Sequence, residues 1–405
     1  MDVSSLMILV YLVSFICAVY LWISEYESYF YGKITDISIS FIPTCLFCCV
    51  IIYCILLYSN INLSKERHFI KIENTQLLDI ICWITICSSI FIIIVYFSDV
   101  VRNLTSGDIL EIRNEAVTIQ RKTPIERLSG PLRIIGSIAG KFAHASYLLL
   151  PYFFYSLCFK KNNKLFNLLI FISTLTPIVM SITRVDRSAT TYYLMQLALA
   201  YFIFKPYFDD EKRKIILKYA YFFVGTLVAY LCLITIAKWG EKDEGVFTKI
   251  ALYIGEPFIN FCNTWNKYEV LDDAYWGNVF PVSSTLLGLK KSYLDYMDYT
   301  LRIYNMSGVR MNVFVTFLGT YLFAFGKIGT IFLSAVVVVI NKLVCSTVKK
   351  TTIDLFSVYC IYVAGVGILC GLTVHYYNTI EIALSAYIYL IMIYNLTRKR
   401  RNRTS

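Results

Sequence analysis

Ten apolar runs recur along the chain, separated by polar segments. Most of them approach or exceed the roughly 20 residues that an α-helix needs to cross the hydrocarbon core of a membrane. The pattern therefore predicts ten membrane-spanning helices, which cover residues 6–23, 39–59, 77–97, 134–159, 165–183, 189–204, 215–237, 328–345, 355–372 and 380–396.

The composition agrees with this pattern and excludes a water-soluble fold. Of the 405 residues, 58% are hydrophobic and 16% are charged, whereas soluble domains carry about 25% charged residues. A soluble protein of this size has too little interior to bury so many apolar side chains. The first run lacks a basic leader and a small-residue cleavage site, so we expect it to be a retained helix. The sequence thus indicates an all-α polytopic membrane protein, with residues 1–405 in one integral membrane domain.

The basic residues indicate how the chain crosses the membrane. Nineteen of the 38 lysines and arginines lie in five short segments that fall on one side when loops are assigned alternately, namely 60–76, 160–164, 205–218, 341–354 and 398–405. Basic loops remain in the cytoplasm, so both termini are predicted to be cytoplasmic. The net charge of +11 is then mostly a consequence of topology, and no nucleic-acid partner is predicted.

Two long segments are assigned to the outer side, residues 98–133 and 238–311. The second segment contains two amphipathic stretches, 250–261 and 286–304. We expect both to lie along the outer membrane surface of the helix bundle. The pattern leaves residues 314–325 as either a re-entrant segment or an eleventh span.

A tight outer turn contains Arg184, Asp186 and Arg187 between two apolar runs. Placing a charge at the membrane edge costs free energy, so each of these residues is expected to have a structural or functional role. Arginines offer planar, bidentate donors that suit phosphate or pyrophosphate. The alternative is an ordinary charged turn in which Asp186 pairs with one arginine.

Other candidate residues are few. His375 lies in a five-residue outer turn, where a neutral imidazole can serve as a general base, although a single histidine is usually structural. Glu256 and Asn260 share a helical face and can bind a sugar or an acceptor hydroxyl, or simply anchor the long segment. The 13 cysteines lie mostly in apolar runs and are interpreted as buried hydrophobes. No metal-binding or glycine-rich phosphate motif occurs, and no cofactor is predicted.

Three short motifs give the chain a resemblance to a known family. They are Thr183-Arg184-Val185-Asp186-Arg187-Ser188, the stretch 253–261, and Asn312-Val313-Phe314-Val315-Thr316-Phe317 leading to Phe325-Gly326-Lys327-Ile328-Gly329. Together with the spans and the long outer segment, they resemble the bacterial O-antigen polymerases of the Wzy type. Ala324 stands where relatives often have an acidic residue, and the arginine-ten-residue-glycine motif of some members is absent from the outer segments.

The resemblance implies a GT-C-like fold with a large periplasmic loop and a metal-independent glycosyltransferase of the bacterial inner membrane. Such an enzyme moves a growing glycan from undecaprenyl pyrophosphate onto a newly flipped, lipid-linked repeat unit. The implied partners besides this lipid-linked substrate and membrane lipids are a chain-length regulator and a flippase. The implied catalytic residues are Arg184, Arg187, His375 and Glu256, and the implied substrate-binding residues are Arg133, Tyr253, Asn260, Arg310, Asn312 and Asn378.

Two other functions remain open. A flippase or transporter of lipid-linked sugars is expected to have short outer loops, repeated halves and helices broken near the membrane midplane. The long segment 238–311 and the absence of a visible repeat favour an enzyme instead. An O-antigen ligase uses the same kind of donor but attaches the glycan to the lipid A core.

Overall fold

The fold is given by a computed structural model of the whole chain. It describes residues 2–401 apart from 25–26, 29–31, 34–38, 62–67, 73–74, 106–122, 161–163, 184–187, 240–245, 268–275, 289–303, 306–307, 310–313 and 349–350. The chain forms two compact units. Unit 1 comprises Met1–Asn62, Glu244–Lys350 and Cys360–Leu384, and unit 2 comprises Leu63–Asp243, Thr351–Tyr359 and Ser385–Ser405.

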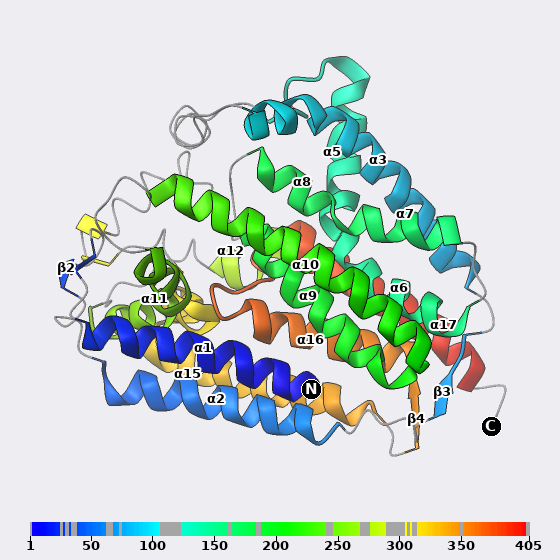
Figure 1. The fold of residues 1–405 in the computed structure, drawn as a ribbon. Coiled ribbons are helices and arrows are strands. Elements are labelled where there is room, and N and C mark those ends of the chain that lie inside the picture. Colours follow the sequence, from blue (N-terminus) through cyan, green and yellow to red (C-terminus); the bar gives the residue numbers. More distant parts are fainter. Residues whose placement is uncertain are drawn as a thin grey trace. The chain divides into compact units, whose positions relative to one another are not determined.

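Unit 1 is built mainly from long helices. Its elements are α1 (Val3–Ile23), a short hairpin of β1 (Glu27–Ser28) and β2 (Gly32–Lys33), α2 (Phe41–Ser59), α11 (Val246–Lys267), α12 (Trp276–Val279), α13 (Pro281–Leu286), α15 (Thr316–Ser346) and most of α16 (Leu355–Cys370). Helices α1, α2 and α15 run side by side (Figure 1), and α2 contacts both of the others. Asp2 directly precedes α1, and its carboxylate accepts a hydrogen bond of 2.8 Å from the Ser5 amide and so caps the first turn.

Unit 2 contains the remaining elements. They are β3 (His68–Ile70), α3 (Gln76–Thr105), α5 (Gly130–His144), the 3₁₀ segment η2 (Ala145–Leu149), α6 (Leu150–Phe159), α7 (Lys164–Thr174), α8 (Thr176–Ile182), α9 (Ser188–Phe204), the 3₁₀ turn η3 (Lys205–Tyr207), α10 (Asp210–Trp239), β4 (Thr352–Asp354) and most of α17 (Ile380–Arg401). Strands β3 and β4 form a short parallel pair in which Phe69 lies opposite Ile353.

All ten apolar runs fold as helices. Eight helical segments of the described chain are long and apolar enough to cross a membrane. Of the other two runs, α16 is an apolar helix of 16 residues and α9 has 17 residues. The protein is therefore a helical, multi-pass membrane protein.

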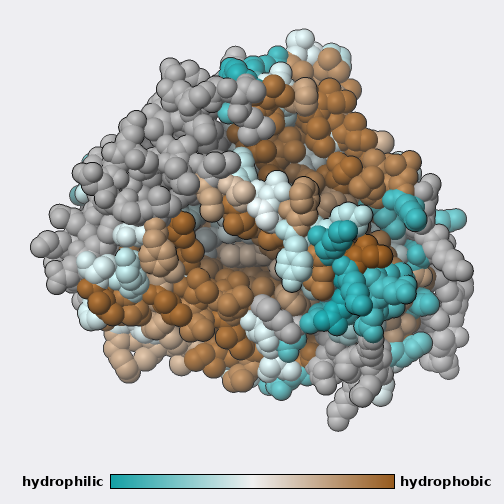
Figure 2. Space-filling model, viewed as in Figure 1, coloured by the Kyte–Doolittle hydropathy of each residue, from teal (hydrophilic) through white to brown (hydrophobic). Residues whose placement is uncertain are grey.

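The surface has the character expected of a protein in lipid. Figure 2 shows apolar residues over α1 and α2 and again over α3 and α5, while hydrophilic residues gather at the amino-terminal end of α10. Ile94 of α3 and Phe222 of α10 are 69% and 80% exposed. In water such side chains would be costly, but against acyl chains they lose nothing by remaining uncovered.

Several predicted cytoplasmic segments meet at one end of unit 2. Phe69, in the segment 60–76, stacks on Phe159 at the end of α6 with ring centroids 4.4 Å apart. It also contacts Tyr207, just after α9, at 5.3 Å. Strand β4 lies in the segment 341–354 and pairs with β3. These contacts bring parts of three basic segments, and the residue directly before a fourth, to one end of unit 2, which agrees with the alternate assignment of the loops.

Two predicted spans are interrupted near their middle by proline. Pro151 lies in the first turn of α6, after η2, and Pro177 lies in the first turn of α8, after Leu175. Proline is tolerated in a first turn because its missing N–H has no intrahelical partner there, but it cannot continue a preceding helix. The first of these spans is therefore made of α5, η2 and α6, and the second of α7 and α8.

Helix α15 is also broken, at Gly326. This residue has φ 67° and ψ −173°, a combination that only glycine adopts without strain. The piece before the break, from Thr316 to Ala324, is buried along its length. It is too short to cross the hydrocarbon core by itself. The segment 314–325 is thus not an eleventh span but a short buried half-helix joined to the span that follows it.

The contact between α1 and α11 is unusually close and gives a stability prediction. A β-carbon at Gly255 would lie 2.6 Å from the backbone nitrogen of Ala18. We expect Gly255→Ala to lower the thermal unfolding midpoint of the detergent-purified protein, at a cost of about 1–3 kcal/mol, because backbone atoms cannot move aside. The matched control is Gly225→Ala in α10, where nothing lies within 4 Å. There alanine should be neutral or stabilising by up to about 1 kcal/mol, and equal midpoints for the two variants would contradict the packing argument.

Candidate functional site

Helix α11 has two distinct faces. One face packs on α1 and α2, where the Ser14 hydroxyl donates 2.8 Å to the Ile254 carbonyl and the Phe258 ring contacts that of Phe47 at 5.3 Å. The helix is buried from Ala251 to Trp265 apart from the partly buried Tyr253 and Ile254. This differs from the expected position along the outer surface of the bundle. The physical reason is that Gly255 allows the backbones of α1 and α11 to approach closely.

The opposite face of α11 is polar and still buried. Tyr253, Glu256 and Asn260 lie three and four residues apart, so they form one stripe along the helix. Glu256 is 8% exposed and Asn260 is fully buried. The Asn260 amide donates 3.1 Å to the carbonyl of Phe314, and the Tyr253 ring meets the Phe314 ring edge-on at 5.2 Å. Two residues predicted to bind substrate are thereby fixed to the chain that leads into α15.

That chain is held in a strained conformation. The amides of Val315 and Thr316 both donate to the Thr373 carbonyl at 3.0 Å. Thr316 has φ 66°, which is rare for a β-branched residue and costs of order 1–3 kcal/mol. Its hydroxyl accepts from the Gly319 amide at 3.3 Å. Strain of this kind gathers at functional positions, and here it fixes the start of the half-helix against the turn after α16.

His375 lies in the same turn and completes the cluster. Its backbone amide donates 3.3 Å to the hydroxyl of Thr320, and its ring lies 5.5 Å from the ring of Tyr321. Burial lowers the pKa of His375 to about 4, and a hydrogen bond with the Val279 backbone acts in the opposite direction. The imidazole is therefore neutral at pH 7.

Burial limits the role of His375. An imidazole gains a charge when it accepts a proton, and burial disfavours that charge. His375 is consequently better suited to orient groups as a neutral hydrogen-bonding partner than to take a proton from a hydroxyl, which leaves Glu256 as the other predicted base.

The lowered pKa predicts a pH-dependent contribution to stability. An unfolded histidine has a pKa near 6.5, so below that value the unfolded chain binds a proton that the folded chain does not. Stability should fall as the pH drops from about 6.5 to about 4, by up to about 3 kcal/mol, and the contribution should level off below the folded pKa. Thermal unfolding of wild type and His375→Gln between pH 7.5 and 4 measures it. Parallel curves for the two proteins would contradict the prediction.

The other residues predicted for the site are placed as follows. Asn378 follows His375 in the turn and is partly buried. Arg133 is exposed on α5, which belongs to unit 2, whereas α11 belongs to unit 1. Arg184, Arg187, Arg310 and Asn312 lie outside the described residues. Among the residues that the structure describes, no group of three or more histidine, cysteine, aspartate or glutamate side chains could hold a metal ion.

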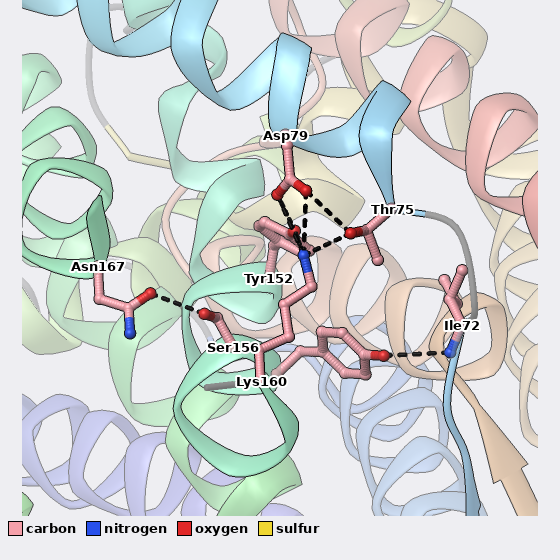
Figure 3. Close-up of polar contacts among 8 residues, drawn as sticks. Ile72, Thr75, Asp79, Tyr152, Ser156, Lys160 and Asn167 are labelled. Carbon is pink, nitrogen blue, oxygen red and sulfur yellow. Dashed lines mark hydrogen bonds and ion pairs between the residues drawn. The ribbon is translucent and has the colours of Figure 1, made fainter. Parts of the chain in front are cut away.

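A second polar network, in unit 2, was not anticipated from the sequence. Figure 3 shows Asp79 of α3 accepting from Tyr152, Thr75 and Lys160, with the ammonium of Lys160 3.1 and 3.2 Å from its two oxygens. Nearby, the hydroxyl of Tyr155 accepts from the Ile72 amide at 3.1 Å. These groups tie the chain before α3 to the end of α6. The available signal was weak: Asp79 is the lone acid in its predicted span, and Lys160 directly follows another.

Comparisons with known proteins add no assignment to this geometry. A scan against protein-family models, a search of curated proteins and a search of solved structures each found no match.

Proposed function

We propose that the chain is a membrane glycosyltransferase, an O-antigen polymerase that joins lipid-linked oligosaccharide repeat units at the outer face of the bacterial inner membrane. The observation that carries the proposal is that the polar face of α11, which bears Glu256 and Asn260, is tied through Phe314 and the strained Thr316 to the turn that contains His375. A carboxylate, an amide, hydroxyls and an imidazole on these connected segments suit the binding and activation of a hydroxyl group. The resemblance of three sequence motifs to the Wzy-type polymerases supplies the reaction.

In the proposed reaction an acceptor sugar hydroxyl attacks the anomeric carbon of the donor glycan. The bond from that carbon to the pyrophosphate oxygen breaks, the new glycosidic bond forms, and the hydroxyl proton passes to Glu256. The leaving pyrophosphate needs stabilisation of its charge, which arginines provide. The proposal keeps this role on Arg184, Arg187 and Arg310, as predicted from the sequence. A flippase that delivers repeat units and a chain-length regulator are the expected partners.

Deleting the gene and examining lipopolysaccharide on a gel tests the function. We expect the long-chain ladder to be lost while a single repeat unit on core remains. Wild-type protein should restore the ladder, and Arg187→Ala protein at the same level should not. Retention of the ladder after deletion would overturn the proposal, and a normal ladder from Arg187→Ala would remove Arg187 from the mechanism.

A transporter of lipid-linked glycans is the second candidate, favoured by the interrupted helices. Broken spans are a feature of transporters, and here α15 breaks at Gly326 while the spans that contain Pro151 and Pro177 are each divided. The same gel separates the candidates. Loss of a transporter removes even the single repeat from core, because no unit reaches the outer face. Loss of a ligase leaves polymer on the carrier lipid and none on core.

A further inference from the structure

The polar stripe of α11 continues beyond Asn260 to Asn263, three residues further along the same face. Asn263 is 4% exposed and Asn260 is fully buried. The side-chain oxygens of both are buried and accept no hydrogen bond. Leaving such an atom unpaired costs about 1–3 kcal/mol, so each needs an explanation.

The contacts of the two amides limit what can explain these oxygens. Asn260 already uses its amide nitrogen on the Phe314 carbonyl, which fixes which end of the side chain is the oxygen. Neighbouring Thr264 is no donor to either of them, because its hydroxyl donates 2.7 Å to the Asn260 backbone carbonyl. The Asn260 oxygen is thus a fixed acceptor, and the buried, unpaired oxygen of Asn263 lies one turn further along the face that carries the Glu256 carboxylate.

The chemistry of this stripe selects its ligand. Carboxylate and amide oxygens all accept hydrogen bonds, so a phosphate, which also offers only acceptors at neutral pH, is repelled. A sugar offers several hydroxyl donors, which such acceptors can bind. The aromatic ring of Tyr253, on the same stripe, adds an apolar surface for the sugar ring.

We propose that Asn260 and Asn263 form a subsite that binds sugar hydroxyls through their two unpaired side-chain oxygens. The subsite rests on the proposed function, and it assigns an orientation to the substrate: glycan hydroxyls lie along α11, and the pyrophosphate lies away from it. Asn263 is a binding residue that sequence reasoning did not identify.

Binding of a soluble oligosaccharide to the purified full-length protein tests the subsite. The probe is the repeat-unit oligosaccharide released from the host's own polysaccharide by mild acid, which carries no pyrophosphate. We expect Asn263→Leu to weaken its binding by about tenfold or more, because a donor on the sugar loses its acceptor. Without sugar, Asn263→Leu should unfold at the same or a higher temperature than wild type, since it removes an unpaired buried atom.

The matched control is Thr264→Val, an isosteric change one residue along the helix, which should leave binding unchanged. No binding by wild type, or equal binding by wild type and Asn263→Leu, overturns the subsite. Sodium provides a second possible outcome. If sodium, but not the oligosaccharide, shifts the unfolding midpoint of wild type and this shift disappears in Asn263→Leu, the two oxygens bind a cation and the sugar subsite is also overturned. The two proposals can also fail separately. If deletion of the gene leaves the polymer ladder intact but oligosaccharide binding depends on Asn263, the subsite stands and only the polymerase function is rejected.

Discussion

Replacing Glu256 with glutamine is expected to abolish polymer formation while leaving the protein folded. Glutamine keeps the size and hydrogen-bonding capacity of the side chain but cannot accept the proton of the attacking hydroxyl. General-base catalysis contributes about 10²- to 10⁴-fold to a rate, so chain extension should slow by at least about a hundredfold. The measurement is the rate at which membrane vesicles carrying the variant extend lipid-linked repeat units.

Glu381→Gln is the control for this experiment. Glu381 is exposed in the first turn of α17 and plays no part in the proposed chemistry, so its variant should extend chains at the wild-type rate. If Glu256→Gln extends chains normally, the proton is accepted elsewhere and the assignment of Glu256 as the base is wrong. A parallel loss in both variants would instead indicate a general effect of charge at this end of the protein.

Replacing Lys160 with methionine is expected to destabilise unit 2 by about 2 kcal/mol. The change leaves the Asp79 carboxylate near the membrane edge with only the neutral donors Tyr152 and Thr75. Breaking a fully buried ion pair costs about 3–5 kcal/mol, and the expected value is smaller because the Lys160 and Asp79 side chains are 17% and 31% exposed. Thermal unfolding in detergent measures the loss. The double variant with Asp79→Asn should recover part of it, since no uncompensated charge remains.

An exposed ion pair in the same unit provides the control. Lys212 lies 3.1 Å from Asp209, but both side chains are more than half exposed. Lys212→Met should therefore change stability by less than about 1 kcal/mol. If Lys160→Met and Lys212→Met shift the unfolding midpoint equally, the Asp79 network contributes no more than a surface pair.

The helices were the most predictable part of the fold. Every one of the ten apolar runs is helical, because in lipid a backbone must satisfy its own hydrogen bonds and a long apolar run has few alternatives to a helix. The predicted grouping of basic segments is also seen in part at one end of unit 2, where Phe69 contacts the ends of two other apolar runs. The breaks within the helices were harder to predict from the sequence. Pro151 and Pro177 indicate an interruption, whereas nothing in the sequence distinguishes Gly326 from a glycine inside a regular helix.

The candidate site was predictable only in part. Glu256, Asn260 and His375 stood out as polar residues beside apolar runs, and the structure connects Asn260 and His375 through the segment that begins at Phe314. The structure then changed the expected role of His375 from a general base to an orienting residue, since burial makes it a weak proton acceptor. Asn263 could not be distinguished from a solvated residue, because whether an amide oxygen is buried and unpaired depends on neighbours that are distant in sequence.

The sequence by itself determined the class of the protein and the positions of its apolar helices, and it predicted the sorting of its charges. These follow from composition and local order, which depend on the chain and on the lipid around it. The tertiary structure alone decided that α11 is buried against α1 rather than lying on the surface, and that residues 260, 314, 316, 373 and 375 meet. Contacts between residues so far apart along the chain depend on close packing, where a missing β-carbon at Gly255 or one strained threonine selects the arrangement.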